Sequence, residues 1–441
     1  MDVELVVPRY CWRRLGRIAG WIGTAHCDMA AAGATPIILL GTSTVIYPCS
    51  LQTLILICNF PVPRSMDKFL KKRSHPSGDS SRPAKRPVRD PETAIVDQRL
   101  TAPRVIVAWN CNGLTSRLRN GDEPAIKLFV ERHAPDVIFL SEVRIAAAND
   151  NPTAKPNPKT KWYRYRMRDG NKKALEDFSL VNTFMRSKEM AKYRCYFSLA
   201  DTKYAGTAML LNTETTAPPI SVRYNLEPVC IKGNVHDGDG RVIVAKFTGF
   251  SILHTYSPNN GWDENHLSRR RDWDQKIKEF VIRKKEAKVN LMWIGDLNVA
   301  PLDVDLSHPA YYKKQKGGRN TAKLGPSRAP PSEEDVGQPG CTPRERSQFR
   351  EILKVGNMVD AYRELVGESD NSGLTWRGHT TGKHAGRGMR IDHCIVSRSV
   401  MPSIVSVQIT GHGFDRIGFL GSDHCPLLIS RQCSKQASED K

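Results

Sequence analysis

Short apolar runs alternate with polar turns along most of the chain, from Arg104 to Ile429. The runs are rich in Val and Ile and have the usual length of β-strands. On this pattern we predict strands at 105–110, 136–140, 208–212, 241–247, 251–256, 290–295, 390–397 and 425–430.

Helical periodicity lies between some of these strands. Apolar residues recur at helical spacing in 272–286, which predicts an amphipathic helix there. A second helix is predicted to begin at Thr342, because Pro343 suits the first turn and Glu345 suits the reciprocal capping position. Strands mixed with helices indicate a two-sheet α/β sandwich or an open α/β sheet, and periodicity alone does not choose between them.

The first 65 residues differ in character from the rest. No charged residue occurs in 29–63, but Pro and Gly break this stretch into short pieces. Three interpretations stay open for 1–65: a membrane anchor, an organelle-targeting segment, or an extension upstream of a true start at Met66.

Four further parts follow. We expect a basic disordered linker at 66–103, where Pro, Ser, Lys and Arg dominate, and one catalytic domain at 104–433. The domain is predicted to carry a Gly- and Pro-rich surface insertion at 316–340, and residues 434–441 form a tail. Basic clusters in the linker, at 71–73 and 85–89, resemble a bipartite nuclear-import signal, and a solvated tail that holds DNA is an equal and compatible interpretation.

The charge and the cysteines narrow the class of protein. The chain has 441 residues and a formal net charge of +20, which indicates a polyanionic partner such as nucleic acid or an anionic membrane face. The 11 cysteines form no close pairs, so a secreted disulfide scaffold is not expected. A zinc cluster of His379, His384, His393 and Cys394 is not favoured, because the spacing fits no usual zinc pattern.

Polar residues recur where the predicted strands end or begin. Singly, each is best explained as a turn cap or a solvated side chain. Together they predict a pocket, because strand ends gather on one side of an α/β fold. The residues of this group are Asn110, Asn112, Glu142, Tyr256, Asn259, Asp296, Asn298, Asp392, Asp423 and His424.

Such a pocket suits phosphodiester hydrolysis. Its carboxylates would be costly to bury unpaired, and a hard divalent cation satisfies them. The reaction needs an activated water and donors aimed at developing negative charge, and neutral amides and histidine supply donors without repelling a phosphate.

The motifs in this order resemble the exonuclease III class of apurinic/apyrimidinic endonucleases, in the endonuclease/exonuclease/phosphatase superfamily. The similarity spans about 104–430 and rests on "WNCNGL", "FLSEVR", "TYSPN", "GDLNVAP", "TPRER", "GMRIDHCIVS" and "GSDHCP". It implies a four-layer α/β sandwich, in which two facing β-sheets are flanked by helices.

The resemblance also implies roles for residues. Glu142 would be the main metal ligand, and Asp296 would activate water or protonate the leaving group. The implied catalytic set is Tyr256, Asp296, Asn298, Asp392 and His424. The implied metal set is Asn112, Glu142, Asp296, Asn298, Asp423 and His424. The implied DNA contacts are Asn110, Arg144, Asn259, Trp376, Met389 and Arg390.

The implied activity is incision of the DNA backbone 5′ to abasic sites with Mg²⁺ or Mn²⁺, together with 3′-phosphodiesterase and 3′–5′ exonuclease activities. The implied partners are double-stranded abasic DNA and base-excision-repair proteins. We expect a monomer without stable membrane association, in the nucleus or alternatively the mitochondrion.

Two other functions stay open: a superfamily phosphoesterase acting on phosphoinositide, sphingomyelin or RNA, and a non-catalytic DNA-binding relative. Three departures from the class pattern affect the site: Asn112 replaces a common Asp, Ser141 a common Gln, and Met389 the usual Trp.

Overall fold

The structure, a computed structural model, describes residues 100–150, 162–226, 236–315 and 332–432. All of them belong to the second of two units, Glu92–Lys441. The predictions for 1–65, for 66–99 and for 434–441 lie outside the described residues. Within the described part, no helix is both long enough and apolar enough to cross a bilayer.

The first sheet has six strands in the order β15-β16-β1-β2-β6-β5. Only β1 and β2 pair in parallel, and the other neighbours are antiparallel. Along the sheet the strands are β15 (Ile404–Ile409), β16 (Leu427–Arg431), β1 (Val105–Asn110), β2 (Val137–Ser141), β6 (Thr207–Asn212) and β5 (Tyr193–Ser198).

The second sheet also has six strands, in the order β11-β14-β10-β9-β8-β7. Here β9 and β10 form the parallel pair. Along the sheet the strands are β11 (Met358–Asp360), β14 (Asp392–Ser397), β10 (Leu291–Asp296), β9 (Phe250–Tyr256), β8 (Val242–Phe247) and β7 (Ser221–Arg223).

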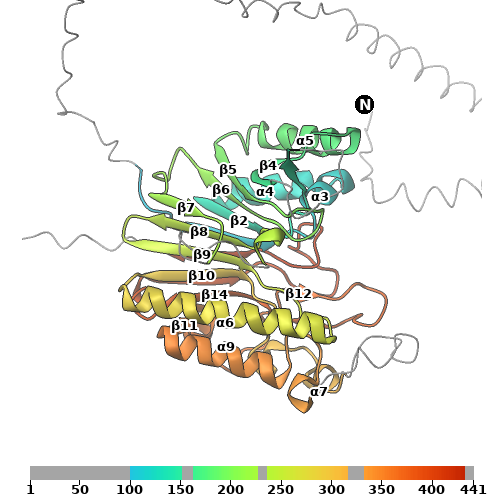
Figure 1. The fold of residues 1–441 in the computed structure, drawn as a ribbon, viewed down its shortest axis with the longest axis vertical. Helices are drawn as coiled ribbons and strands as arrows, with labels where there is room; N and C mark the ends of the chain where they lie inside the picture. The colour runs from blue at the N-terminus through green and yellow to red at the C-terminus, as the bar shows by residue number, and fades with distance from the viewer. Residues whose placement is uncertain (1–99, 151–161, 227–235, 316–331, 433–441) are drawn as a thin grey trace, which may run out of the picture. The chain divides into compact units, whose positions relative to one another are not determined.

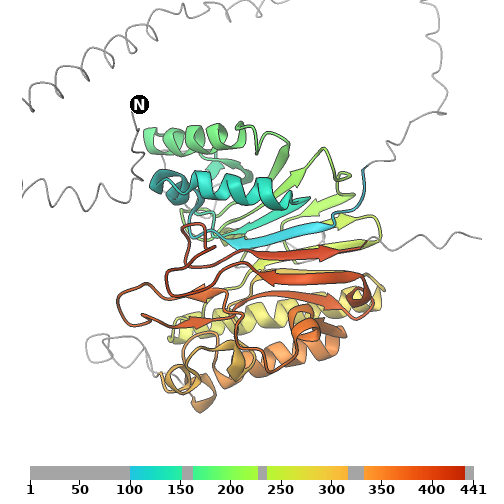
Figure 2. The same ribbon diagram turned by 180° about the vertical axis from the view of Figure 1, so that it is seen from behind.

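The two sheets face each other, and helices cover both outer faces (Figure 1, Figure 2). The first sheet is covered by α3 (Leu114–Asn120), α4 (Glu123–His133) and α5 (Lys172–Met185), and the second by α6 (Glu264–Glu286) and α9 (Pro343–Gly356). The predicted four-layer sandwich is therefore confirmed, and the open sheet is not formed.

The four-layer arrangement explains why the strands appear in the sequence as continuous apolar runs. In β1, Ile106 and Ala108 belong to the core between the sheets, whereas Val107 and Trp109 pack in the core under the helices. Successive strand residues point to opposite faces, and here both faces are buried.

The two predicted helices are present, and one is longer than expected. α6 begins at Glu264, because the Asp263 side chain accepts a hydrogen bond from the His266 N–H at 3.0 Å. α9 begins with the predicted capping box: Thr342 Oγ1 accepts from the Glu345 N–H at 3.3 Å, and Glu345 Oε2 accepts from the Thr342 N–H at 3.2 Å.

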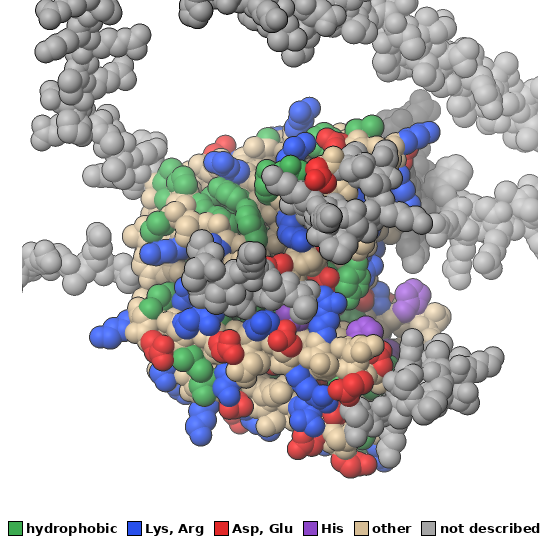
Figure 3. All heavy atoms as spheres, in the orientation of Figure 1, with side chains coloured by type: hydrophobic (Ala, Val, Ile, Leu, Met, Phe, Trp, Pro, Cys, Tyr) green, Lys and Arg blue, Asp and Glu red, His purple; other side chains and the backbone are tan. Residues whose placement is uncertain are grey.

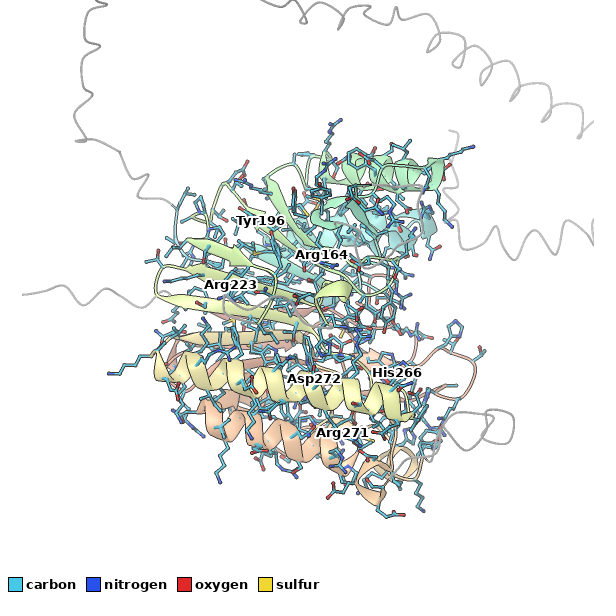
Figure 4. The ribbon with its side chains drawn as sticks, in the orientation of Figure 1. Arg164, Tyr196, Arg223, His266, Arg271 and Asp272 are labelled. Carbon is cyan, nitrogen blue, oxygen red and sulfur yellow. The ribbon has the colours of Figure 1, made fainter. Side chains whose placement is uncertain are left out.

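The prediction of a surface insertion at 316–340 is wrong for its last part. Residues 332–340 pack against the domain, and the Asp335 side chain is buried between Arg271 at 3.1 Å and Arg344 at 2.8 Å. Arg271 lies on α6 (Figure 4). Ion pairs to α6 and α9 therefore hold residues 332–340, which their composition alone would assign to a surface loop. Residues 316–331 lie outside the described residues.

Shorter elements complete the described part. They are β3 (Ala147–Asn149), β4 (Trp162–Met167), β12 (Trp376–Arg377), β13 (Gly388–Met389), α7 (Pro309–Lys313), α10 (Ala361–Val366) and the 3₁₀ turns η1 (Asp237–Asp239), η2 (Asp303–Asp305), η4 (Glu333–Asp335) and η5 (Met401–Ser403).

Over α6 and α9, Lys and Arg side chains are mixed with Asp and Glu (Figure 3). That face is therefore not a basic patch that would attract a polyanion.

Candidate active site

The strand ends that carry polar residues meet at one end of the sandwich. β1 runs parallel to β2 in the first sheet, and β9 runs parallel to β10 in the second, so the carboxyl ends within each pair lie side by side. β14 runs the other way, and its first residue, Asp392, lies opposite the last residue of β10, Asp296.

A single amide joins the two sheets at this end. Asn110 Nδ2, at the end of β1, donates to Glu142 Oε1 at 3.0 Å and to Asp296 Oδ2 at 2.9 Å. Asn110 and Asp296 are buried, and Glu142 is partly exposed. The predicted metal ligand and the predicted proton-transfer group are thus neighbours across the sandwich.

Beside them His424 pairs with Asp392. His424 Nδ1 lies 2.8 Å from Asp392 Oδ2, and His424 Nε2 faces Asp296 Oδ2 at 3.9 Å. Burial would lower the pKa of His424, but the Asp392 carboxylate outweighs it and raises this pKa to about 10. The histidine is therefore a buried imidazolium at neutral pH.

At Asp296, in contrast with His424, the surroundings disfavour the charged form of the side chain. Burial, and then the nearby Asp392 carboxylate, raise the pKa of Asp296 to about 7, although His424 and the Asn110 amide act against them. A carboxyl group whose pKa lies near neutrality can both accept and release a proton under physiological conditions.

The backbone around His424 is held by two contacts that fix its position. The His424 N–H donates to Ser422 Oγ at 3.1 Å, and the His424 carbonyl accepts from Trp109 Nε1 at 3.0 Å. Ser422 Oγ also donates to the Asn110 carbonyl at 2.7 Å. Sequence reasoning missed Ser422, although a small polar residue directly before the Asp–His pair was a visible signal.

Asp423 closes the site on the side of the first sheet. Its two oxygens accept from Asn112 Nδ2 at 2.7 Å and from Trp376 Nε1 at 3.1 Å. Burial would raise the pKa of Asp423, but His424 and these donors hold it below the ordinary value. Asp423 therefore stays ionised, as a cation ligand must.

Four of the predicted residues have left-handed backbones: Asn112 (φ 48°), Glu142 (φ 52°), Arg144 (φ 51°) and Asn298 (φ 48°). Asn tolerates this region, but Glu and Arg adopt it rarely, and such a conformation costs about 1–3 kcal/mol. Each of these residues follows a buried strand within three residues. The surrounding contacts therefore hold strained turns that aim polar side chains into the site.

Tyr256, the last residue of β9, is buried against an arginine that sequence reasoning missed. The Arg241 guanidinium lies 4.6 Å from the Tyr256 ring centroid, and its Nη1 donates to the Tyr256 carbonyl at 3.0 Å. Burial, and then Glu142, raise the pKa of Tyr256 well above its ordinary value, so the phenol keeps its proton and can donate it in a hydrogen bond.

Asn259 and Asn298 meet at the edge of the same site. Asn259 Nδ2 donates to Asn298 Oδ1 at 3.4 Å, and Asn298 Nδ2 donates to the Ser257 carbonyl at 2.9 Å. The Asn298 N–H donates to Asp296 Oδ1 at 3.0 Å, which orients the Asp296 carboxyl group.

The prediction that Arg390 contacts DNA is corrected by its placement. Arg390 is 1% exposed, and its guanidinium pairs with Asp305 at 2.7 Å and with Asp360 at 2.8 Å. Met389 is also buried, in a small apolar cluster beside Trp376. Arg390 therefore braces the start of β14 from inside, where two buried carboxylates need a cation.

The donor set fits a hard divalent cation. Asp296, Asp392 and His424 form a group whose ligand atoms lie within 4.8 Å of one another. Within this group Asp392 Oδ2 and His424 Nδ1 already bind each other. One oxygen of Glu142, the predicted main metal ligand, accepts from Arg144 Nε at 2.9 Å, and the Arg144 side chain is 44% exposed.

Comparison with known proteins agrees with this geometry. Residues 107–424 match the Endonuclease/Exonuclease/phosphatase family. The chain belongs to that family. The match begins in β1 and ends at His424, so it spans the whole of the site described above.

Two curated relatives and one solved structure are similar to this family member. A DNA-(apurinic or apyrimidinic site) endonuclease of Arabidopsis thaliana is 39% identical over 371 residues, which cover 82% of this chain and 95% of the relative. The DNA repair nuclease APEX1 of Danio rerio is 26% identical over 343 residues, covering 77% and 86%. The crystal structure of AP endonuclease LMAP from Leishmania major is 20% identical with a TM-score of 0.51, covering 77% and 92%, and it supports the fold.

The structure places two members of the disfavoured zinc cluster in β14. His393 and Cys394 are successive residues of β14, and His393 Nε2 lies 2.7 Å from the Val299 carbonyl. The metal-ligand group found among the described residues contains none of His379, His384, His393 and Cys394.

Proposed function

We propose that this protein hydrolyses the DNA backbone 5′ to abasic sites, with Mg²⁺ as cofactor and Mn²⁺ as a substitute. One observation carries the proposal: the Asn110 amide links Glu142 to Asp296 directly beside the Asp392–His424 pair. The names of the Arabidopsis and zebrafish relatives support DNA as the substrate.

Different residues of the site would neutralise charge, transfer a proton and bind the scissile phosphate. A cation held by Glu142 and neighbouring oxygens would neutralise charge on the scissile phosphate. Asp296, with a pKa near neutrality, takes a proton from the attacking water or gives one to the leaving oxygen. The His424 imidazolium donates to a phosphate oxygen through Nε2, because Asp392 occupies Nδ1.

Neutral donors complete the binding of an anionic substrate. The Tyr256 phenol and the amides of Asn112 and Asn298 donate hydrogen bonds without adding negative charge beside a phosphate. The same chemistry would serve 3′-phosphodiesterase and 3′–5′ exonuclease activity, which we propose as secondary activities of the same site.

The substrate is proposed as double-stranded DNA bound by a monomer, with base-excision-repair proteins as further partners. The net charge of +20 supports a polyanion, and the basic clusters at 71–73 and 85–89 support the nucleus as the location. The alternative of a phosphoinositide, sphingomyelin or RNA phosphoesterase uses similar metal chemistry, and the names of the relatives do not favour it.

The test pairs two site variants with one matched control. Asp296→Asn should lower the incision rate of an abasic duplex by about 10²–10⁴ while its affinity for that duplex changes little. Glu142→Gln should raise the Mg²⁺ concentration needed for half-maximal rate, because an amide is a weaker ligand than a carboxylate. Glu351→Gln, on the outer face of α9, should change neither quantity.

Three outcomes would contradict the proposal. Near wild-type turnover of Asp296→Asn would remove Asp296 from proton transfer. An unchanged Mg²⁺ titration of Glu142→Gln would move the cation elsewhere. If the wild-type protein hydrolysed a phosphoinositide and left abasic DNA intact, the DNA-repair function itself would be wrong.

A further inference from the structure

The chain between β15 and β16 forms a small hairpin with two large apolar side chains at its surface. Phe414 is 65% exposed, the highest value among the exposed large hydrophobic residues that the structure describes, and Ile417 is 57% exposed. Scattered exposed hydrophobic residues are common. Phe414 differs from such scattered residues because it lies at the tip of a hairpin, where the fold does not require an apolar side chain.

The hairpin is held in one shape. The His412 N–H donates to the Ile417 carbonyl at 3.0 Å, and the Ile417 N–H donates back to the His412 carbonyl at 3.1 Å. At its base Gly418 (φ 83°) packs so closely that a Cβ would lie 2.3 Å from the Thr410 carbonyl oxygen. Phe419, the next residue, is fully buried. Phe414 is therefore presented on a braced support.

A short chain of contacts connects this tip to the active site. The Arg377 N–H donates to the Asp423 carbonyl at 3.0 Å, and the Arg377 guanidinium lies 5.8 Å from the centroid of the Phe414 ring. Arg416 Nη2 donates to the Arg377 carbonyl at 2.8 Å. The red chain between β15 and β16 and the loop between β12 and β13 lie at the same end of the sandwich (Figure 1, Figure 2).

The charges around the tip suit a phosphate backbone. In the ranges that the structure describes, the Nε atoms of Arg377 and Arg416 are buried without a hydrogen-bond partner, and the Asp423 carboxylate acts on the charge of Arg416. An exposed aromatic ring beside the Arg377 guanidinium combines the two features that bind nucleic acid, namely stacking on bases and attraction to phosphates.

We propose that Phe414 enters the gap that a missing base leaves in duplex DNA and stacks there on the neighbouring bases. The proposal rests on the proposed function, because it needs abasic duplex DNA at the active site. Apolar side chains that insert between base steps are a known way of reading deformed DNA. A base pair that lacks one base costs little to open, so a ring at this position would favour abasic over intact duplex.

The experiment measures binding and stacking in the full-length protein. All variants carry Asp296→Asn, with Mg²⁺ present, so that the duplex stays intact during the measurement. Phe414→Ala should weaken binding to an abasic duplex by about tenfold or more, and binding to the intact duplex much less. Phe414→Trp should restore the affinity, because indole stacks at least as well as phenyl.

A fluorescent base next to the gap reports stacking directly. With 2-aminopurine beside the abasic site, the Phe414 protein should change the fluorescence on binding, and Phe414→Ala should not. Val405→Ala is the matched control. Val405 is 53% exposed and lies near the start of β15, at the other end of the strand that leads to the hairpin.

The outcomes separate this proposal from the function on which it rests. If the protein with native Asp296 does not incise abasic duplex, both proposals fall. If it does, and Phe414→Ala matches Val405→Ala in affinity, in preference for abasic duplex and in fluorescence, only the role of Phe414 is overturned. Equal melting temperatures of the Phe414 and Val405 variants show that any loss is not unfolding.

Discussion

Two histidines buried between the layers of this protein have opposite charge states. His254, in the middle of β9, is fully buried beside Phe139, and burial lowers its pKa to about 4. His424, at the end of the sandwich, is almost as buried, yet its pKa is raised to about 10. At neutral pH the first is therefore neutral and the second is charged.

The neighbours account for the difference. The close polar side chain at His254 is the Ser141 hydroxyl, whose Oγ lies 3.3 Å from Nε2, and a hydroxyl does not offset the cost of a buried charge. His424 has the Asp392 carboxylate at 2.8 Å. Burial therefore does not decide the charge of an interior histidine in this fold. The charge of His424 is decided by nearby carboxylates, first of all Asp392 at the start of β14 and then Asp296 and Asp423, all of them in the candidate active site.

The largest effect should come from breaking the charged pair. His424→Ala and Asp392→Ala should each lower turnover of an abasic duplex by about 10²–10⁴, and the double variant should be little worse than either, because the two residues act as a unit. Affinity for the duplex should change far less, since the contact strengthens as charge develops. Single-turnover kinetics of the three variants decide this, and additive losses would show that the residues work independently.

A smaller effect is expected on the pKa of His424 when its carboxylate partner is replaced, which should bring this pKa closer to that of His254. In Asp392→Asn the carboxylate is lost while burial persists, so the pKa of His424 should fall well below its value of about 10. Ring-proton NMR titration of the metal-free protein measures it. The His254 resonances serve as the internal reference and should not move. A His424 pKa that stayed near 10 would mean that another group stabilises the charge.

The smallest expected effect concerns stability and the neutral histidine. Folded His254 takes up a proton only near pH 4, but the unfolded chain does so near pH 6.5, so between these values the unfolded state binds more protons. Stability should therefore be complete above pH 6.5 and fall as the pH drops toward 4, by at most about 3 kcal/mol from this residue.

Urea unfolding at about pH 8 and pH 5 tests it. His254→Gln should lose less stability than the wild-type protein between the two values, because its side chain does not titrate. His266→Gln, which removes an exposed histidine at the start of α6 (Figure 4), is the comparison variant for the loss of a histidine outside the core. If His254→Gln kept the full wild-type pH dependence, the neutral state of His254 would not be its cause.

Several features of the fold could be predicted from the chain alone. All the predicted strands form within about two residues of their expected bounds, and the capping box of α9 forms as expected, because both depend on residues close in sequence. β5 and β15 were missed because apolar and polar residues mix along them, as is usual for strands at the edge of a sheet. The packing of 332–340 was missed because it depends on ion pairs to α6 and α9.

The site was predicted as a set of residue types and not as an arrangement. Asn110, Glu142 and Asp296 stood out because each follows an apolar run, but only the parallel pairing of β1 with β2 and of β9 with β10 places them together. Arg241 gave no signal that distinguishes it from other arginines in the sequence, and the signal of Ser422 was only its position directly before the Asp–His pair. Arg390 was predicted to contact DNA. The two carboxylates that pair with it in the interior come from segments distant in sequence, so the sequence did not indicate these ion pairs.

The sequence by itself determined the strands, the helix caps and the positions at which polar side chains leave the apolar runs, because alternation and capping act over a few residues. The tertiary structure alone decided which of those side chains meet, that one histidine is charged and the other neutral, and that Phe414 lies at the tip of a hairpin beside Arg377. These properties depend on distance, burial and charge between segments up to hundreds of residues apart, and no local pattern records them.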